Sequence, residues 1–505
     1  YTENGSATYK NSGNPAVDFF FHVVPKSPSS DIICLLRLSW EHDPLLTLKL
    51  ICNLRGVRGT GKSDKEGFYT AALWLHENHP KTLALNMGPI SGFGYLKDMP
   101  EILFRLLEGS NTRKPKEDVS SFPYRYELLK KDIEFFKKGD LYKLGLSAKW
   151  CPTIDSSYDE VTLLCESIAR RVFPKDEYEE YKDMEDVHYA FTVRDRLRKE
   201  VLVPLRKALD IPEVYISAKK WDTLPYNKVP SVAMKLYKTL FYKHDEERFV
   251  EYLEKVKSGK ATIAAGALLP HEIIASLKND ENGGEVAELQ WKRMVDDLAK
   301  KGKMNNCIAI SDVSGSMMGE PMEVSVALGL LISELSEEPW KGKLITFNTN
   351  PRFHTIQGKR LKEKTNFIRQ MDWGGSTDLQ KVFDRILEVA VSVKIPEEQM
   401  IKRLFIFSDM EFNQASQCAW ETDYKVIQRK YKEKGYEKVP EIVFWNLRHS
   451  MATPVPSTEP GVALVSGFSK NLVTLFLEEG GVLNPEAAML AAVAKPEYDT
   501  LVVYD

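Results

Sequence analysis

The feature that most constrains this chain is a change in hydrophobic spacing at Met304. Before it, from about Ser29 to Lys301, apolar residues recur mostly at the three- and four-residue intervals of amphipathic helices. After it, short apolar runs rich in β-branched and aromatic residues alternate with helical stretches. One chain of 505 residues therefore carries two folding patterns. We predict two domains, residues 1–303 and 304–505.

The first pattern predicts an all-α module with about nine helices joined by short connections. The expected helices are Asp43–Leu54, Glu66–His76, Met99–Leu107, Tyr126–Lys137, Glu160–Val172, Val187–Leu209, Pro230–Tyr242, Asp245–Lys257 and Gly284–Lys300. Such a run is typical of a helical repeat or superhelix, although the sequence has no clean period. The polar stretch Asn111–Phe122 is the candidate for a flexible insert.

The second pattern predicts a doubly wound, Rossmann-like α/β domain with a parallel sheet. The expected strands are Asn306–Ile310, Lys343–Asn348, Arg403–Phe407 and Glu441–Leu447, with Val462–Val465 and Leu501–Tyr504 as further candidates. The expected helices are Met322–Leu335, Leu361–Met371, Leu379–Val393 and Tyr424–Lys434. The strand runs are continuously apolar, as in strands that are buried on both faces.

Oxygen-bearing side chains follow these strands where ligands bind in doubly wound sheets, beyond the carboxyl ends. They are Asp312, Ser314, Ser316, Thr377 and Asp409. Hard oxygen ligands suit Mg²⁺ or Ca²⁺ better than soft metals. The alternative is that Asp312 and the two serines only cap a strand-to-helix turn. Because no general base or nucleophile stands beside them, we expect a recognition site and not an enzyme.

These five residues resemble the metal-ion-dependent adhesion site of the von Willebrand factor A domain, whose pattern is Asp-x-Ser-x-Ser, then Thr, then Asp. Asp312, Ser314, Ser316, Thr377 and Asp409 fill all five positions. The resemblance implies a bound Mg²⁺, or another divalent cation such as Ca²⁺ or Mn²⁺. It also implies that an acidic group of a partner completes the coordination.

Gly56–Ser63 (GVRGTGKS) matches the phosphate-binding Walker pattern letter for letter. That pattern needs a buried strand before it and a helix after it. The preceding residues favour a helix, so we interpret the segment as a basic turn and keep a P-loop nucleotide-binding protein as the less favoured alternative. Four cations on or beside this turn are candidates for gripping RNA phosphates: Arg55, Arg58, Lys62 and Lys65.

A second basic stretch, Arg194–Lys207, places Arg194, Arg198 and Lys199 near one helix face. This face is either simply solvated or a nucleic-acid or partner surface. Residues 1–303 hold 47 basic and 45 acidic residues, whereas residues 304–505 hold 22 and 27. A net charge of +2 excludes a histone-like basic module, so RNA binding would require a local patch.

Composition argues against membrane insertion. The longest uninterrupted apolar run, Ala487–Ala494, is far shorter than the ~18 residues that span a bilayer. Six cysteines without a CxxC pair or a regular framework indicate reduced thiols. We therefore expect an intracellular protein, cytoplasmic or nuclear, that is monomeric.

Several longer phrases resemble an uncharacterised plant family that joins a TROVE-like helical module to a von Willebrand A-like domain. They are Tyr1–Phe20, Arg55–Tyr69, Phe93–Leu107, Trp150–Cys165 and Ala261–Ile273. The same pairing builds the Ro-type ribonucleoprotein proteins, whose helical repeats form a ring that binds small non-coding and misfolded RNAs. The resemblance implies a non-enzymatic RNA-binding scaffold. A metal-dependent protein-interaction adaptor without RNA binding is the alternative, in which the metal captures a partner's Asp or Glu.

Overall fold

The computed structural model describes residues 1–505 apart from nine short stretches. These are 109–125, 279–283, 348–349, 372–376, 394–395, 397–398, 414–421, 437–438 and 478–483. The candidate insert Asn111–Phe122, the residues Gly374, Gly375 and Ser376, and Cys418 lie outside the described residues.

The C-terminal part folds around a six-stranded mixed sheet. Its strands are β1 (Cys307–Ser311), β2 (Lys343–Thr346), β3 (Phe353–Thr355), β4 (Arg403–Ser408), β5 (Glu441–Asn446) and β6 (Val462–Ser466). They lie in the order β3-β2-β1-β4-β5-β6, and only the β2–β3 pair is antiparallel. Strands β1, β4 and β6 are buried at every position, as their continuous apolar runs predict.

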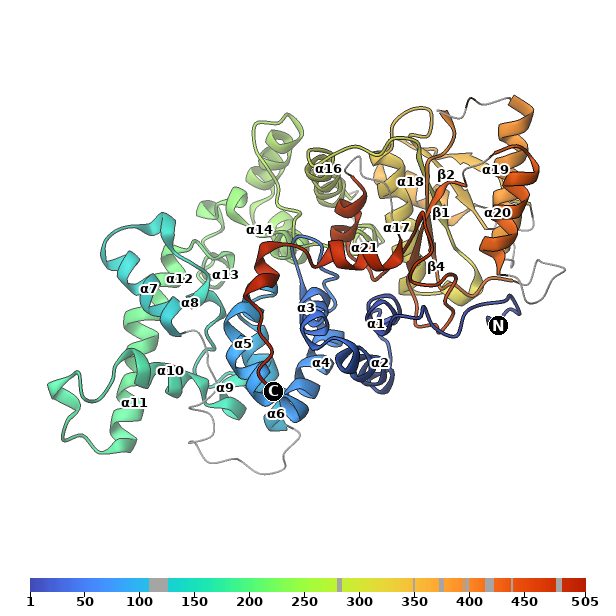
Figure 1. Ribbon diagram of the computed structural model, residues 1–505. Helices are drawn as coiled ribbons and strands as arrows, with labels where there is room; N and C mark the ends of the chain where they lie inside the picture. Colours follow the sequence, from blue (N-terminus) through green and yellow to red (C-terminus); the bar gives the residue numbers. More distant parts are fainter. Residues whose placement is uncertain are drawn as a thin grey trace. The chain divides into compact units, whose positions relative to one another are not determined.

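Helices cover both faces of this sheet. Figure 1 shows α17 (Glu320–Leu335) and α18 (Leu361–Arg369) on one side, with α19 (Leu379–Val393) and α20 (Asp423–Glu433) on the other. The α/β class is therefore confirmed. The chain runs from β1 outward to β2 and β3, and then returns to the opposite side of β1 with β4. This reversal places the topological switch point between β1 and β4, where ligands bind in open α/β sheets.

The remaining described residues are mainly helical. The helices before the sheet are α1 (Pro15–His22), α2 (Ser29–His42), α3 (Pro44–Arg55), α4 (Lys65–Asn78), α5 (Pro80–Phe93), α6 (Asp98–Glu108), α7 (Tyr126–Lys137), α8 (Ser147–Trp150), α9 (Ser157–Thr162), α10 (Leu164–Val172), α11 (Asp186–Arg196), α12 (Val203–Ala208), α13 (Pro212–Ser217), α14 (Ser231–Lys257), α15 (Pro270–Ala275) and α16 (Glu285–Ala299). Helix α21 (Pro485–Ala492) follows the sheet. None of the helices in the described part of the chain is long and apolar enough to cross a membrane.

The described residues group into two compact units. The sheet unit consists of Tyr1–Ala71, Met234–Leu236 and Lys255–Val503. The helical unit consists of Ala72–Ala233, Tyr237–Glu254 and Tyr504–Asp505. Residues before the sheet thus contribute to both units. The division into domains at residue 303/304 stays a prediction.

The N-terminal helices of the sheet unit begin where local capping dictates. The Asn14 side chain accepts hydrogen bonds from the backbone of α1, and Asp43 accepts one from Leu46 N at 2.9 Å at the start of α3. A proline occupies the first turn of both helices. Helix α1 packs beside β6, so residues near the start of the sequence contact a strand near its end.

The helical unit encloses a core of its own, built largely from α10, α11 and the residues after them. Its buried members include Leu129, Ile168, Tyr181, Val193 and Leu205. The predicted helix Tyr126–Lys137 has the bounds of α7. These side chains follow the helical spacing of the sequence, which explains why the helical character of this part was predictable.

Three predicted elements need correction, and one strand was not predicted. Glu160–Val172 is two helices, because Leu163 adopts a left-handed conformation with φ 53°. Val187–Leu209 contains a π-helical turn at Leu197–Leu202, just before Pro204, which has no N–H to donate. Leu501–Tyr504 forms no strand, since Tyr504 N donates to Thr82 Oγ1 instead of to a sheet. The three-residue strand β3 was not expected because it is too short to show a period.

Candidate functional site

The candidate site begins with a buried aspartate at the end of β1. Asp312 N donates to Phe407 O at 2.9 Å and so extends the β1–β4 pairing by one residue. The Asp312 carboxylate accepts hydrogen bonds from Ser314 N at 2.9 Å and from Ser408 Oγ at 2.7 Å. Burial, and secondarily the charge of Asp409, raise the pKa of Asp312 to about 6. Two acidic side chains therefore share one buried edge of the sheet.

Ser314 and Ser316, which follow Asp312 at alternate positions, lie between this buried edge and the surface. Ser314 is half-buried and Ser316 is exposed, and their Oγ atoms lie 3.0 Å apart. Residues 315–317 form a single 3₁₀ turn that leads into α17. The turn explains how alternate residues bring both hydroxyls to the same place.

Asp409 follows the neighbouring strand β4 and is 1 % exposed. Its Oδ1 accepts a hydrogen bond from Glu411 N at 3.1 Å, whereas Oδ2 accepts no hydrogen bond from the described residues. The guanidinium of Arg448 lies 3.8 Å from Oδ2, beyond hydrogen-bond distance. A buried carboxylate oxygen without a partner is costly, and a bound cation is one way to satisfy it.

Thr377 comes from the segment that precedes α19. It is buried, and its Oγ1 donates to Glu411 O at 3.1 Å and to Asn413 Oδ1 at 3.2 Å. Asn413 N in turn donates to Thr377 O at 3.1 Å. The structure thus attaches Thr377 to the loop that carries Asp409.

The five predicted metal ligands therefore belong to three adjoining segments at the switch point. All their side-chain donors are oxygens, which suits a hard cation such as Mg²⁺. Among the residues that the structure describes, no three His, Cys, Asp or Glu side chains gather as a metal site. A cation here would therefore depend on hydroxyl groups as well as on the two carboxylates. The donor chemistry fits such an ion, as does Oδ2 of Asp409, which accepts no hydrogen bond from the described residues.

The Walker-like segment has a different structure. Helix α3 precedes it, so the strand that a P-loop requires is replaced by a helix. Gly61 is needed for close backbone packing, because a Cβ there would lie 2.1 Å from Gly56 O. The segment is a tight turn whose glycines serve its own backbone.

Lys62, the lysine of that segment, points into the protein. It is 2 % exposed, and its Nζ donates to Phe20 O, to Val23 O at 3.2 Å and to Ser466 Oγ at 2.7 Å. Burial lowers the pKa of Lys62 to about 7, with the charge of Asp64 opposing the shift. The expectation that Lys62 grips a phosphate is wrong for this structure, because its ammonium binds α1 and β6 instead.

The other predicted RNA-contacting cations of this turn divide into two classes. Arg55 is buried, which also removes it from the surface. Arg58 and Lys65 are exposed, and Lys65 Nζ lies 3.5 Å from the carboxylate of Glu66. The predicted cluster of four surface cations is thus reduced to two.

The three candidate RNA-contacting cations of the second basic stretch have acidic neighbours. Arg194 pairs with Asp155 at 3.0 Å, and Arg198 and Lys199 lie 3.4 Å and 2.8 Å from Asp195. The side chains of Arg198 and Lys199 remain more than half exposed. They are accessible to a partner, but part of their charge is locally balanced.

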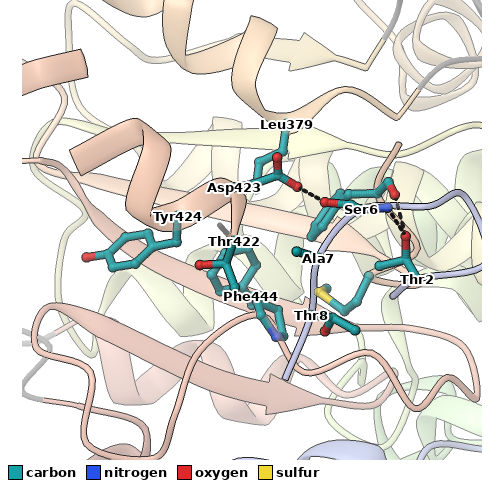
Figure 2. A pocket seen from close by; sticks show the side chains of 12 residues that line it. Thr2, Ser6, Ala7, Thr8, Leu379, Thr422, Asp423, Tyr424 and Phe444 are labelled. Carbon is teal, nitrogen blue, oxygen red and sulfur yellow. Dashed lines mark hydrogen bonds between the residues drawn. The ribbon is translucent and has the colours of Figure 1, made fainter. Parts of the chain in front are cut away.

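Three features of this edge escaped the sequence analysis. Glu411 is a buried carboxylate two residues after Asp409, and Arg448 reaches the edge from the loop after β5. Figure 2 shows a third, since Thr2 and Ser6 of the N-terminal segment lie beside Asp423 at the same side of the sheet. Only the Asp-Met-Glu spacing after β4 hinted at Glu411, and no local signal pointed to the N-terminal segment.

Comparison with known families places this geometry in context. Residues 2–127 and 122–304 match a family described as a domain of unknown function, DUF2828, and together span more than half of the chain. The chain belongs to the DUF2828 family. Residues 306–500 match a second family, described as the domain of unknown function DUF7788. Neither description mentions a TROVE or von Willebrand A module, so both of these resemblances, and a plant source, stay predictions.

The sequence similarity to one viral protein covers nearly the whole chain. The uncharacterized protein L728 of Acanthamoeba polyphaga mimivirus is 29 % identical over 521 residues, covering 98 % of this chain and 87 % of its own length. Both halves of the chain therefore occur together in that protein.

Among solved structures, the chain is similar to the RO (RSR) protein of Deinococcus radiodurans. The identity is 12 % and the TM-score 0.39, with 96 % of this chain and 99 % of that chain covered. A TM-score of this size does not establish a common fold. Function is therefore inferred below from the residues of this chain.

Proposed function

We propose that the sheet unit binds a divalent cation through Asp312, Ser314, Ser316, Thr377 and Asp409 and uses it to recognise an anionic group of a partner. The observation that carries this proposal is the buried Oδ2 of Asp409, which has no hydrogen-bond partner in the part of the chain that the structure describes. It belongs to the second of two neighbouring acids at the switch point of the sheet. A cation placed there would offset the repulsion between two carboxylates that are both removed from water.

The chemistry of the edge favours Mg²⁺, with Ca²⁺ and Mn²⁺ as alternatives, because every proposed ligand is a hard oxygen. When bound, the cation would supply a Lewis-acidic position for a carboxylate or phosphate oxygen. Ser314 and Ser316 would present their hydroxyls to it from the solvent side. Arg448, whose side chain is 48 % exposed, adds a permanent positive charge for the same anionic group.

Recognition without catalysis fits the groups around the edge. The nearby histidines are engaged elsewhere: His22 contacts Ser450 O and Thr453 Oγ1, and His449 pairs with Asp31 at 2.9 Å. A general base needs to lie within hydrogen-bond reach of the reacting proton. We therefore propose that this unit is a binding module and not an enzyme.

The cation proposal is tested by titrating Mn²⁺ into the full chain and into Asp312→Ala, with binding followed by electron paramagnetic resonance and calorimetry. Wild type should bind one Mn²⁺ that Mg²⁺ displaces, and Asp312→Ala should lose it. Asp384→Ala is the matched control, because Asp384 is a surface acid of the same unit that pairs with Lys430 at 2.7 Å. Absence of binding to wild type, or undiminished binding to Asp312→Ala, would refute the proposal.

For the helical unit we propose a second function, binding of structured or single-stranded RNA, as in a Ro-type scaffold. One surface supports it. Phe191 is 74 % exposed and Val187 is 70 % exposed on the same face of α11, just before the exposed Arg198 and Lys199. Exposed aromatic rings beside cations are the combination that stacks on unpaired bases while holding phosphates.

Fluorescence anisotropy with labelled hairpin and single-stranded RNA tests this second function. Affinity should fall steeply with salt, and Phe191→Ala should weaken it about tenfold. Leu85→Ala is the control, because Leu85 is an exposed apolar residue of the same unit with no ring to stack. Absent or salt-independent RNA binding would refute this second function and favour the alternative, a metal-dependent protein-interaction adaptor that does not bind RNA.

A further inference from the structure

The loop after β4 is held from outside by the N-terminal segment, Tyr1–Tyr9. Thr2 Oγ1 donates to Phe412 O at 2.7 Å, and Asn4 Nδ2 donates to Glu411 O at 2.6 Å. Gly5 forms an antiparallel bridge with Asn413. These contacts join residues about 410 positions apart in the chain, so the segment is an integral neighbour of the candidate cation site.

Further contacts anchor the segment on both sides of that loop. Ser6 Oγ donates to Asp423 Oδ2 at 2.5 Å, as Figure 2 shows. Thr8 exchanges hydrogen bonds with the backbone of Thr453, and Tyr9 bridges to the same residue. The segment thus spans the carboxyl edge from α20 to the loop after β5.

Glu411 is the residue at which the segment and the candidate site meet. Its carboxylate, buried with the rest of the side chain, accepts hydrogen bonds from Glu3 N at 2.5 Å and from Ser450 Oγ at 2.6 Å. Its backbone N donates to Asp409 Oδ1, and its backbone O accepts the hydroxyl of Thr377. One residue therefore contacts the N-terminal segment and two of the five proposed ligands.

The backbone between Asp409 and Glu411 adopts an unfavourable conformation. Met410 has φ 66°, in the left-handed region that a residue with a bulky side chain seldom adopts. Such a conformation persists only when its surroundings hold it. The contacts of Glu411 with Glu3, Asn4 and Ser450 are the surroundings that hold this loop.

We propose that docking of the N-terminal segment and occupancy of the candidate cation site are coupled through Glu411, which acts as a positioning residue for Asp409 and Thr377. This inference rests on the proposed cation binding. Because coupling is reciprocal, the docked segment raises cation affinity, and a bound cation tightens docking of the segment. A partner that displaces residues 1–9 therefore lowers the affinity of the site for the cation.

The test compares the full chain with variants of the segment and of Glu411. Asn4→Ala removes one contact with Glu411, and Glu411→Gln keeps the shape of the side chain while removing its charge. Each should lower Mn²⁺ affinity at least about fivefold. Lys10→Ala is the matched control, because Lys10 is an exposed residue that directly follows the segment, and the Mn²⁺ affinity of this variant should not change.

Hydrogen exchange of residues 1–9 with and without Mn²⁺ supplies the reciprocal readout. Saturating Mn²⁺ should slow exchange of this segment at least about fivefold in wild type. In Asp312→Ala it should have no effect. If wild type binds Mn²⁺ while exchange of the segment and the affinity of Asn4→Ala stay unchanged, the coupling is refuted and the proposed cation site stands. If wild type binds no Mn²⁺, both are refuted.

Discussion

The turn Gly56–Ser63 and the segment Asp312–Ser316 are both polar loops that precede a helix, yet they differ in how their polar groups are satisfied. In the first, Lys62 is buried and its ammonium is bound by backbone carbonyls and a hydroxyl. In the second, two serine hydroxyls reach the surface beside a buried carboxylate oxygen that accepts no hydrogen bond from the described residues. Although both motifs match their patterns in full, the Walker-like one is structural.

This difference shows what separates a binding site from a structural turn. A group whose hydrogen-bonding capacity is used inside the protein contributes to folding and has nothing left for a ligand. A buried polar atom without a partner costs stability, and proteins tolerate such a cost mainly at functional sites. Variants of the two loops should therefore affect different properties.

The largest expected effect is on cation binding by Asp409→Asn. The amide retains the acceptor for Glu411 N but removes the charge beside Asp312, so Mn²⁺ affinity should fall at least about 100-fold, as calorimetry can measure. Without divalent ions, urea unfolding should show unchanged or higher stability, because the repulsion with Asp312 is gone. A clearly less stable metal-free variant would show that the carboxylate is structural after all.

The next largest effect is expected on stability, from a change in the turn Gly56–Ser63. Lys62→Met should lower the free energy of unfolding by about 2 kcal/mol, because it removes donors from Phe20 O, Val23 O and Ser466 Oγ. Cation binding should not change. Lys65→Met, three residues away and exposed, should cost less than about 0.5 kcal/mol. Loss of ATP binding in Lys62→Met without loss of stability would instead restore the P-loop interpretation.

The next effect, smaller when expressed per pH unit, is expected in the pH dependence of stability. Burial lowers the pKa of Lys62 to about 7, whereas an unfolded lysine titrates near 10.4. Between these values the unfolded state binds more protons, so Lys62 makes stability rise with pH, by at most about 1.4 kcal/mol per pH unit. Below pH 7 both states are protonated and the penalty is fully present. The difference in the free energy of unfolding between wild type and Lys62→Met, measured from pH 7 to 9, isolates the contribution of Lys62. A difference that does not change with pH would contradict the lowered pKa of the buried ammonium.

The smallest effect is expected for Ser316→Ala. Loss of one exposed hydroxyl should weaken Mn²⁺ binding three- to fivefold, below about 1 kcal/mol, and leave unfolding unchanged because Ser316 bonds only to Ser314 among the described residues. Ser392→Ala, an exposed serine on α19, is the control. Equal Mn²⁺ affinities of the two variants would remove Ser316 from the ligand set.

Local features of the chain were predictable because they depend on neighbouring residues. The apolar spacing gave α7 and α19 with their observed bounds, and the Asp43–Pro44 pair marks the start of α3. The predicted strand Arg403–Phe407 lies within β4. Even the adjacency of Asp312 and Asp409 follows from a rule of topology, since parallel strands end at one edge.

The features that the analysis missed depend on residues far apart in the chain. Lys62 belongs to a strong local motif, but the hydrogen bonds of its buried ammonium depend on Ser466 and on the end of α1. Arg448 and Glu411 are unremarkable in the sequence and acquire a role only beside Asp409. Nothing in the phrase that contains Thr2 and Asn4 indicates contact with residues more than 400 positions away.

The sequence by itself determined the two folding patterns, the strand-to-helix alternation after Met304 and the oxygen donors at the strand ends, because periodicity and capping act over a few residues. Only the tertiary structure decided which polar groups are satisfied. It buried Lys62, joined the N-terminal segment to Glu411 and, within the described residues, left Oδ2 of Asp409 without a hydrogen bond. Satisfaction of a buried polar group depends on partners from distant parts of the chain, which meet only after folding.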